Sequence, residues 1–176
     1  MNSVADTKRK PINNITCCTD DFARLGLDIL SRGSQLRFQA GGSSMRPLIQ
    51  DADIVLIEPV TGKKLKVGDV ALCSIPHRGA IAHRVVRKQN LPNGHLFLIQ
   101  GDQATQPDGW VNDEQILGRL ASIERNGAVL KMWHPAMRIL SLFRVAQARW
   151  QLGRAPWTQK FLQWIKQRPF FCRYLS

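Results

Sequence analysis

The feature that most constrains the fold is a series of short β-like runs between Gly33 and His134, each bounded by turn-forming residues. The runs are rich in Val, Ile, Leu and Phe, which is typical of half-buried strands. The expected strands cover residues 35–39, 54–58, 70–75, 81–87, 95–100, 118–124 and 129–133. Residues 92–94 (Pro-Asn-Gly) and 126–127 (Asn-Gly) are hairpin signals between neighbouring runs. The sequence therefore predicts a mostly β, largely antiparallel domain.

Helical patterns flank this β region on both sides. Residues 20–32 carry apolar side chains at helical spacing behind residues of good N-terminal capping type, which predicts a short helix. After His134, apolar residues recur at three- and four-residue steps, and a second such segment begins near Pro156. We therefore expect a flexible N-terminal lead over residues 1–18, a β domain with a short N-terminal helix over 19–133, and a tail over 134–176 formed by a C-terminal pair of amphipathic helices.

The charge of the chain is strongly asymmetric. The formal net charge is +12, and residues 125–176 hold ten Lys or Arg with no Asp or Glu, whereas the first 124 residues hold 15 basic and 13 acidic side chains. A basic segment of this kind favours an anionic partner, either a nucleic acid or an acidic membrane surface. Charge alone does not choose between the two.

Several classes of protein are disfavoured by composition. The four cysteines show neither zinc-ligand spacing nor a disulfide framework, so we expect a reducing compartment, no metal and no cofactor. The first fifteen residues lack the apolar run of a secretory signal peptide, and no stretch approaches the ~20 apolar residues of a spanning helix. We expect the protein to be cytoplasmic or peripheral to a membrane.

One serine and one histidine stand out as candidate catalytic residues. Ser44 follows a glycine-rich approach and precedes Pro47, a context that can hold a serine out of the sheet with its backbone N–H available to an oxyanion. A serine hydroxyl needs a neighbouring base, and His83 lies in a strand-like run that could hold one rigidly. Gly-Ser-Ser also occurs in plain loops, and a lone strand histidine is more often structural. Taken alone, these two residues leave the chemistry open.

The two residues belong to a series of six segments whose order and spacing resemble the type I signal peptidase superfamily. The segments are Ser44–Pro47, Asp53–Ile57, Leu65–Val70, Ala82–Val86, Gln100–Gln103 with the later Asp108, and Ile116–Leu120. The fourth is similar to the general-base segment of the archaeal and endoplasmic-reticulum branch, where histidine replaces the lysine of most bacterial enzymes. The resemblance covers about residues 41–130 and implies a signal-peptidase/LexA-like antiparallel β catalytic domain.

The resemblance also implies an activity and a set of site residues. The chain would be a serine endopeptidase that cleaves a precursor or leader peptide, with Ser44 as nucleophile, His83 as general base and Asp108 as the aspartate that orients the imidazole. Asp102 is the alternative carboxylate, with a local turn role as its competing interpretation. The oxyanion hole would rest on the backbone N–H of Ser44, with Ser43 as a possible substitute donor, because the serine that many bacterial relatives carry two positions before the nucleophile is absent here.

Two other functions are compatible with these features. The SOS-repressor autoproteases share the implied fold, but they use lysine where this chain has His83, and the N-terminal part here is too short for a full DNA-binding domain. From a different class, the chain could be a non-catalytic basic adaptor that binds membrane or nucleic acid through its tail on a degenerate peptidase fold. Retention of Ser44, His83 and an aspartate in register favours the enzyme.

The basic tail suggests a membrane partner more than a nucleic acid. Trp150, Trp157 and Trp164 recur at intervals of seven among arginines and lysines, a combination that suits a membrane interface. We therefore expect peripheral contact with an anionic membrane through residues 136–176. The alternative is that these aromatic side chains pack on the β domain or on a protein partner.

Overall fold

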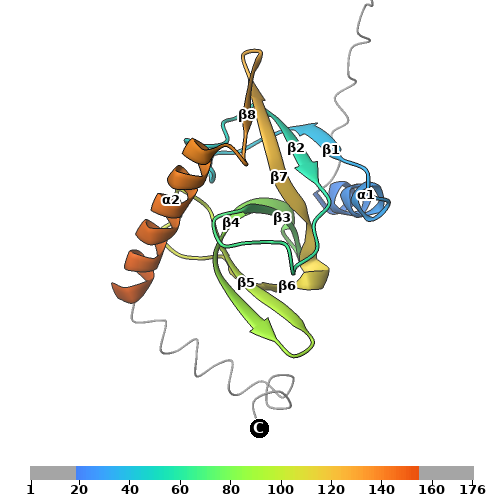
Figure 1. Cartoon of the computed structure of the whole chain (residues 1–176). Coiled ribbons are helices and arrows are strands. Elements are labelled where there is room, and N and C mark those ends of the chain that lie inside the picture. Colours follow the sequence, from blue (N-terminus) through green and yellow to red (C-terminus); the bar gives the residue numbers. More distant parts are fainter. Residues whose placement is uncertain (1–18, 155–176) are drawn as a thin grey trace, which may run out of the picture.

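A computed structural model describes residues 19–154 of the chain. Within this range, eight strands form one sheet in which every neighbouring pair is antiparallel. The strands are β1 (Leu36–Gln39), β2 (Ile54–Glu58), β3 (Val70–Ile75), β4 (Gly79–Leu91), β5 (Gly94–Gln100), β6 (Gly109–Asn112), β7 (Ile116–Arg125) and β8 (Ala128–Lys131). Their order is β1-β2-β7-β3-β4-β5-β6, and β8 pairs with β7. Figure 1 shows that the sheet curls strongly on itself.

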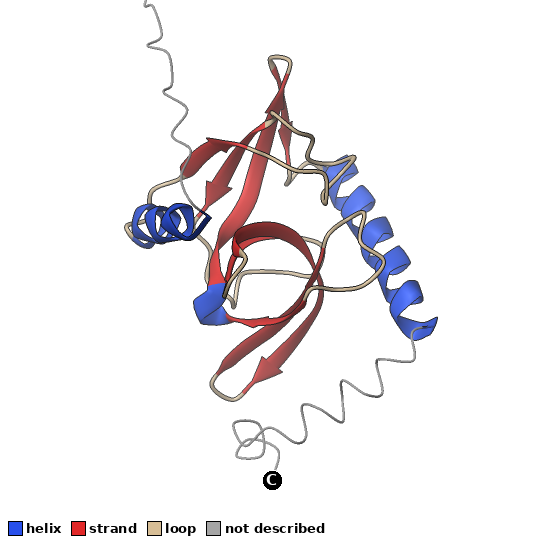
Figure 2. Ribbon diagram, turned by 180° about the vertical axis from the view of Figure 1, so that it is seen from behind, coloured by secondary structure: helices blue, strands red, loops and turns tan. Residues whose placement is uncertain are grey.

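Three further elements complete the described chain. Helix α1 (Thr19–Ser31) precedes the sheet, a short 3-10 turn, η1 (Asp113–Gln115), links β6 to β7, and helix α2 (Pro135–Arg154) follows β8. The two helices lie on opposite sides of the sheet (Figure 2). None of the helices within residues 19–154 is long and apolar enough to cross a bilayer.

The mostly β, antiparallel prediction is confirmed, with two differences in the strands. β4 is longer than the expected run over 81–87, because it continues into a hairpin with β5 that closes at residues 92–93. β6 was not expected, since four residues that begin with Gly and end with Asn carry almost no strand signal. The expected lead over 1–18 and the second C-terminal helix lie outside the described residues.

The hairpin predicted at residues 126–127 is confirmed in its backbone geometry. Asn126 has a φ of 50° and Gly127 a φ of 78°, so both residues take the left-handed conformation that a tight two-residue turn between twisted strands requires. This turn pairs β7 with β8 and brings the chain to the start of α2.

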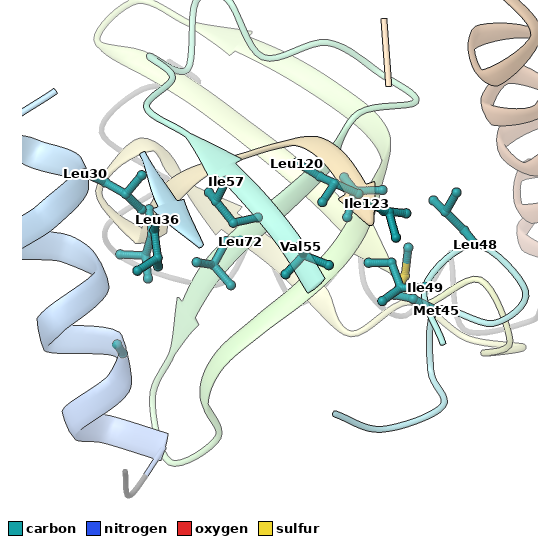
Figure 3. Packing of buried hydrophobic residues seen from close by; sticks show 13 residues of the cluster. Leu30, Leu36, Met45, Leu48, Ile49, Val55, Ile57, Leu72, Leu120 and Ile123 are labelled. Carbon is teal, nitrogen blue, oxygen red and sulfur yellow. The ribbon is translucent and has the colours of Figure 1, made fainter. Parts of the chain in front are cut away.

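The main core lies between α1, the strands β2 and β7, and the loop that joins β1 to β2. The alternate residues Val55 and Ile57 of β2 are buried, as expected for a strand with one face in a core. The loop contributes Met45, Leu48 and Ile49 to the same cluster (Figure 3). The loop that carries Ser44 is therefore anchored in the core through its apolar residues.

A smaller cluster joins α2 to the other side of the sheet. Ala148 and Leu152 of α2 pack with Val86 of β4 and Leu98 of β5. The side chain of Arg149 donates a hydrogen bond of 3.1 Å to the backbone oxygen of Val86. The first helix of the expected tail is thus packed against the β domain and does not project from it.

Candidate active site

The candidate nucleophile lies in the loop of residues 40–53, which folds back between β1 and β2. Backbone hydrogen bonds close the base of the loop, from the N–H of Ala40 to Asp53 and from the N–H of Ala52 to Ala40. Gly42 has a φ of 93°, a conformation that disfavours any side chain, and its N–H donates to a carboxylate oxygen of Asp51. The chain reaches Ser44, which is exposed, directly after this turn.

A partly buried ion pair holds the far end of the same loop. The carboxylate of Asp53 accepts hydrogen bonds of 2.8 and 2.6 Å from the guanidinium of Arg125 on β7. The hydrogen bonds from Arg125 hold the pKa of Asp53 below its usual value, although burial opposes this. Arg125 also donates to the backbone oxygen of Leu48. The loop is therefore fixed by charge at one end and by apolar packing in its middle.

His83 lies near the middle of the long strand β4, opposite Ala71 of β3, and is 5% exposed. Its Nε2 atom is 2.9 Å from Oγ of Ser44. Its Nδ1 atom is 2.6 Å from a carboxylate oxygen of Asp108, which lies directly before β6. The structure thus brings together Ser44, His83 and Asp108 from three separate segments, in the order nucleophile, base and carboxylate.

The surroundings of Asp108 keep its carboxyl group ionised. Burial opposes ionisation, but hydrogen bonds and charge interactions with His83 and with Arg78 outweigh it and lower the pKa of Asp108. Arg78 donates a hydrogen bond of 2.9 Å to the second carboxylate oxygen. A carboxylate can only accept, so Nδ1 of His83 carries the proton, and Nε2 is left to accept the hydroxyl proton of Ser44.

Asp102, the alternative carboxylate, has a different partner. Its two oxygens accept hydrogen bonds of 2.7 and 2.6 Å from the guanidinium of Arg84, and both side chains are almost completely buried. Arg84 also donates to the backbone oxygen of Gly68 and to the hydroxyl of Ser141 on α2. The structure therefore pairs Asp102 with Arg84, while the imidazole of His83 is paired with Asp108.

The segment that carries Asp102 nevertheless supports the site through its backbone. The N–H of Gln103 donates a hydrogen bond of 2.9 Å to the backbone oxygen of Ser44. A Cβ atom at Gly101 would come within 3.0 Å of that oxygen and within 3.2 Å of Nε2 of His83. A side chain at this position would crowd both the serine and the histidine, so glycine suits the close approach of the loop.

Two groups were expected to stabilise an oxyanion. The backbone N–H of Ser44 meets no hydrogen-bond acceptor within residues 19–154, so it is available to a substrate oxygen. Ser43 is exposed, and in the same range its hydroxyl makes no hydrogen bond, while its backbone oxygen accepts from Arg46. This arrangement is compatible with an oxyanion hole centred on the N–H of Ser44.

Sequence reasoning missed the two arginines that hold the aspartates. Arg78 and Arg84 each follow a histidine, at residues 77 and 83, and nothing in that pattern indicated their partners. Ser141 was also missed, because it lies in a segment whose charge and tryptophan spacing pointed to attachment. All three contacts span more than 15 residues, so only the folded chain reveals them.

No group of three His, Cys, Asp or Glu side chains converges like metal ligands within residues 19–154. Comparison of the chain with protein-family models and with curated proteins finds no match to either. The geometry of Ser44, His83 and Asp108 therefore carries the functional argument.

Proposed function

We propose that this chain is a serine endopeptidase of the signal peptidase type, built on a signal-peptidase/LexA-like β domain. The observation that supports it is the continuous hydrogen-bonded series from Ser44 through His83 to Asp108, at 2.9 and 2.6 Å. The order of the six sequence segments supports the same family. The substrate under this proposal is a precursor or leader peptide.

The proposed reaction begins with attack of Oγ of Ser44 on the scissile carbonyl carbon. As the new C–O bond forms, the hydroxyl proton passes to Nε2 of His83, and Asp108 stabilises the imidazolium through its bond to Nδ1. The tetrahedral intermediate collapses, the C–N bond breaks, and the proton on Nε2 moves to the leaving amine. A water molecule, deprotonated by the same nitrogen, then hydrolyses the acyl-enzyme and releases Ser44.

The position of the nucleophile is suited to an extended peptide. β1 lies at one edge of the sheet and leads directly into the loop of Ser44. An extended chain that pairs with such an edge presents its carbonyl groups at regular intervals beside the serine. The negative oxygen of the intermediate would then face the N–H of Ser44, which is a stronger donor to an oxyanion than to a neutral carbonyl.

A labelling experiment tests this proposal directly. A fluorophosphonate probe reacts covalently with a serine that is activated by a base. We expect the parent protein to be labelled at Ser44, Ser44→Ala to be silent, and His83→Ala to be silent or very slow. Ser43→Ala is the matched control, because it removes a neighbouring exposed hydroxyl and should keep labelling.

Digestion of a mixed peptide library identifies the substrate class. We expect cleavage products from the parent and none from Ser44→Ala. The Ser44→Ala, His83→Ala double variant should be no less active than either single variant, since the two residues act as one unit. A parent protein that stays unlabelled, or that is labelled at another serine, would contradict the proposal and favour the non-catalytic adaptor.

A further inference from the structure

Helix α2 has one buried face and one exposed face. The residues Ser141, Val145, Ala148 and Leu152 are buried against the sheet, at the spacing i, i+4, i+7 and i+11. Ile139, Phe143, Ala146 and Trp150 follow the same spacing two residues earlier in the chain. Two residues correspond to about 200° around an α-helix, so this second row lies on the opposite side of α2.

The outward row is apolar and exposed. Ile139 is 70% exposed, Phe143 66% and Trp150 61%, and Leu142 beside them is 55% exposed. Trp133, just before the helix, is 71% exposed, and Lys131 lies over its ring. Water-facing positions of a surface helix are normally polar, and a row of large apolar side chains marks a binding surface. Packing of these aromatic residues on the chain's own sheet, one of the alternatives left by the sequence, leaves Phe143 and Trp150 more than half exposed.

We propose that the outward row of α2 binds the surface of an anionic lipid bilayer. Residues 126–154 hold five Lys or Arg and no Asp or Glu, so the helix brings only positive charge to its partner. Arg144 and Arg149 lie on the flanks of α2, between the buried and the outward rows, whereas Arg138 is held in an ion pair of 2.8 Å with Asp69. A helix with an apolar centre, cationic flanks and tryptophan at its ends is suited to lie at the headgroup level, with its rings below the phosphates and its arginines among them.

Charge also argues against three other occupants of this surface. A second copy of the chain would bring its own basic helix against this one, and the chain's own residues 155–176 would bring four basic and no acidic side chains. Like charges at such a contact are unfavourable. A nucleic acid requires cations directed at its phosphates, whereas the centre of the outward row is uncharged. An anionic bilayer matches both the apolar centre and the basic flanks.

The inward face of α2 ties this surface to the proposed active site. The hydroxyl of Ser141 accepts a hydrogen bond from Arg84, which is the partner of Asp102. A cleft lined by Gly101, Asp102 and Thr105 on one side has Arg144 and Gln147 of α2 on the other. A bilayer on the outer side of α2 would therefore lie about one helix diameter, ~10–12 Å, from the loop beside Ser44. This step rests on the proposed peptidase function and would favour substrates held at the membrane.

Vesicle flotation with the full chain tests the proposal, with phosphatidylglycerol/phosphatidylcholine vesicles compared with pure phosphatidylcholine. We expect binding to the anionic vesicles at low salt that weakens as salt rises. The triple variant Ile139→Ser, Phe143→Ser, Trp150→Ser should bind about 100-fold more weakly, because it loses the apolar contacts with the bilayer. Leu25→Ser, Leu27→Ser is the matched control, because it removes two exposed apolar side chains from α1 on the other side of the sheet.

The outcomes separate this proposal from the peptidase function. The triple variant should keep fluorophosphonate labelling of Ser44 in solution. A parent protein that is not labelled would count against the peptidase function but would leave the membrane result standing. Equal flotation of the triple and the control variants would overturn the membrane proposal. Equal binding to neutral and anionic vesicles would also overturn it. So would a full chain that does not bind vesicles but uses the same three residues to form a dimer or to bind a DNA or RNA oligonucleotide.

Discussion

The two candidate carboxylates should respond in opposite ways to the same isosteric change. Asp102→Asn removes the counter-charge of Arg84, whose side chain is only 2% exposed, in a pair joined by two hydrogen bonds. Breaking a buried pair from one side costs about 3–5 kcal/mol, because the remaining charge is left without compensation. Arg84 keeps its hydrogen bonds to Gly68 and Ser141, so we expect a destabilisation at the lower end of this range, about 3 kcal/mol.

Asp108→Asn should instead affect catalysis. Its pair with Arg78 is half exposed on the arginine side, and such pairs contribute at most about 1 kcal/mol. The carboxylate that fixes the tautomer of His83 is lost, however, and a triad of this kind loses about four orders of magnitude in kcat without it. Slow residual reaction of Ser44 with the probe should remain.

Thermal unfolding and probe kinetics, measured side by side, decide between the two roles. For a chain of this size 1 kcal/mol corresponds to about 2–4 °C in Tm, so Asp102→Asn should melt roughly 6–12 °C below the parent. At temperatures well below its Tm, it should label within about tenfold of the parent rate. Asp108→Asn should melt within about 4 °C of the parent and label very slowly. An inactive Asp102→Asn with parental Tm, together with a fully active Asp108→Asn, would refute the assignment.

Three further predictions concern single residues. Gly101→Ala should keep the fold but lower kcat at least tenfold, because its methyl group would lie 3.0 Å from the backbone oxygen of the nucleophilic serine and 3.2 Å from the base; steady-state kinetics check this. Asp53→Asn should lower the free energy of unfolding at neutral pH, as measured by urea unfolding. Because Arg125 lowers the pKa of Asp53, the difference in this free energy from the parent should be complete above about pH 5 and should shrink as the pH falls below about 4. Cys73 should resist thiol reagents at pH 8 until the protein unfolds, because burial raises the pKa of its thiol to about 12.

The sequence alone was sufficient for the class of fold and for most of its strands, including the one that carries His83. Short runs of β-branched and aliphatic residues between turn formers are a local signal, and each of the seven expected strands begins within two residues of an observed strand. The tight turn at Asn126 and Gly127 is equally local, since only residues that accept a positive φ fit it. A strand as short as β6 has too few residues for such a signal, and its pairing with β5 defines it.

The choice between the two aspartates required the tertiary structure. Asp102 and Asp108 both stand in turn-like sequence, and each lies within reach of a basic strand residue, because His83 and Arg84 are adjacent on β4. Successive residues of a strand point to opposite faces of the sheet, so one carboxylate meets the imidazole and the other meets the guanidinium. Which meets which depends on how the chain between β5 and β6 turns back, and the sequence carries no local signal for that path.

The tail shows the same division between local pattern and folded context. Its helical period and its basic charge were readable directly, because both depend only on spacing and composition. The burial of Ser141, Val145 and Leu152 could not be predicted from the sequence, since α2 is apolar on more than one side and either row could have packed on the sheet. Small residues such as Ser141 and Ala148 allow the helix to approach β4 closely, while the bulky side chains of Phe143 and Trp150 are left outside.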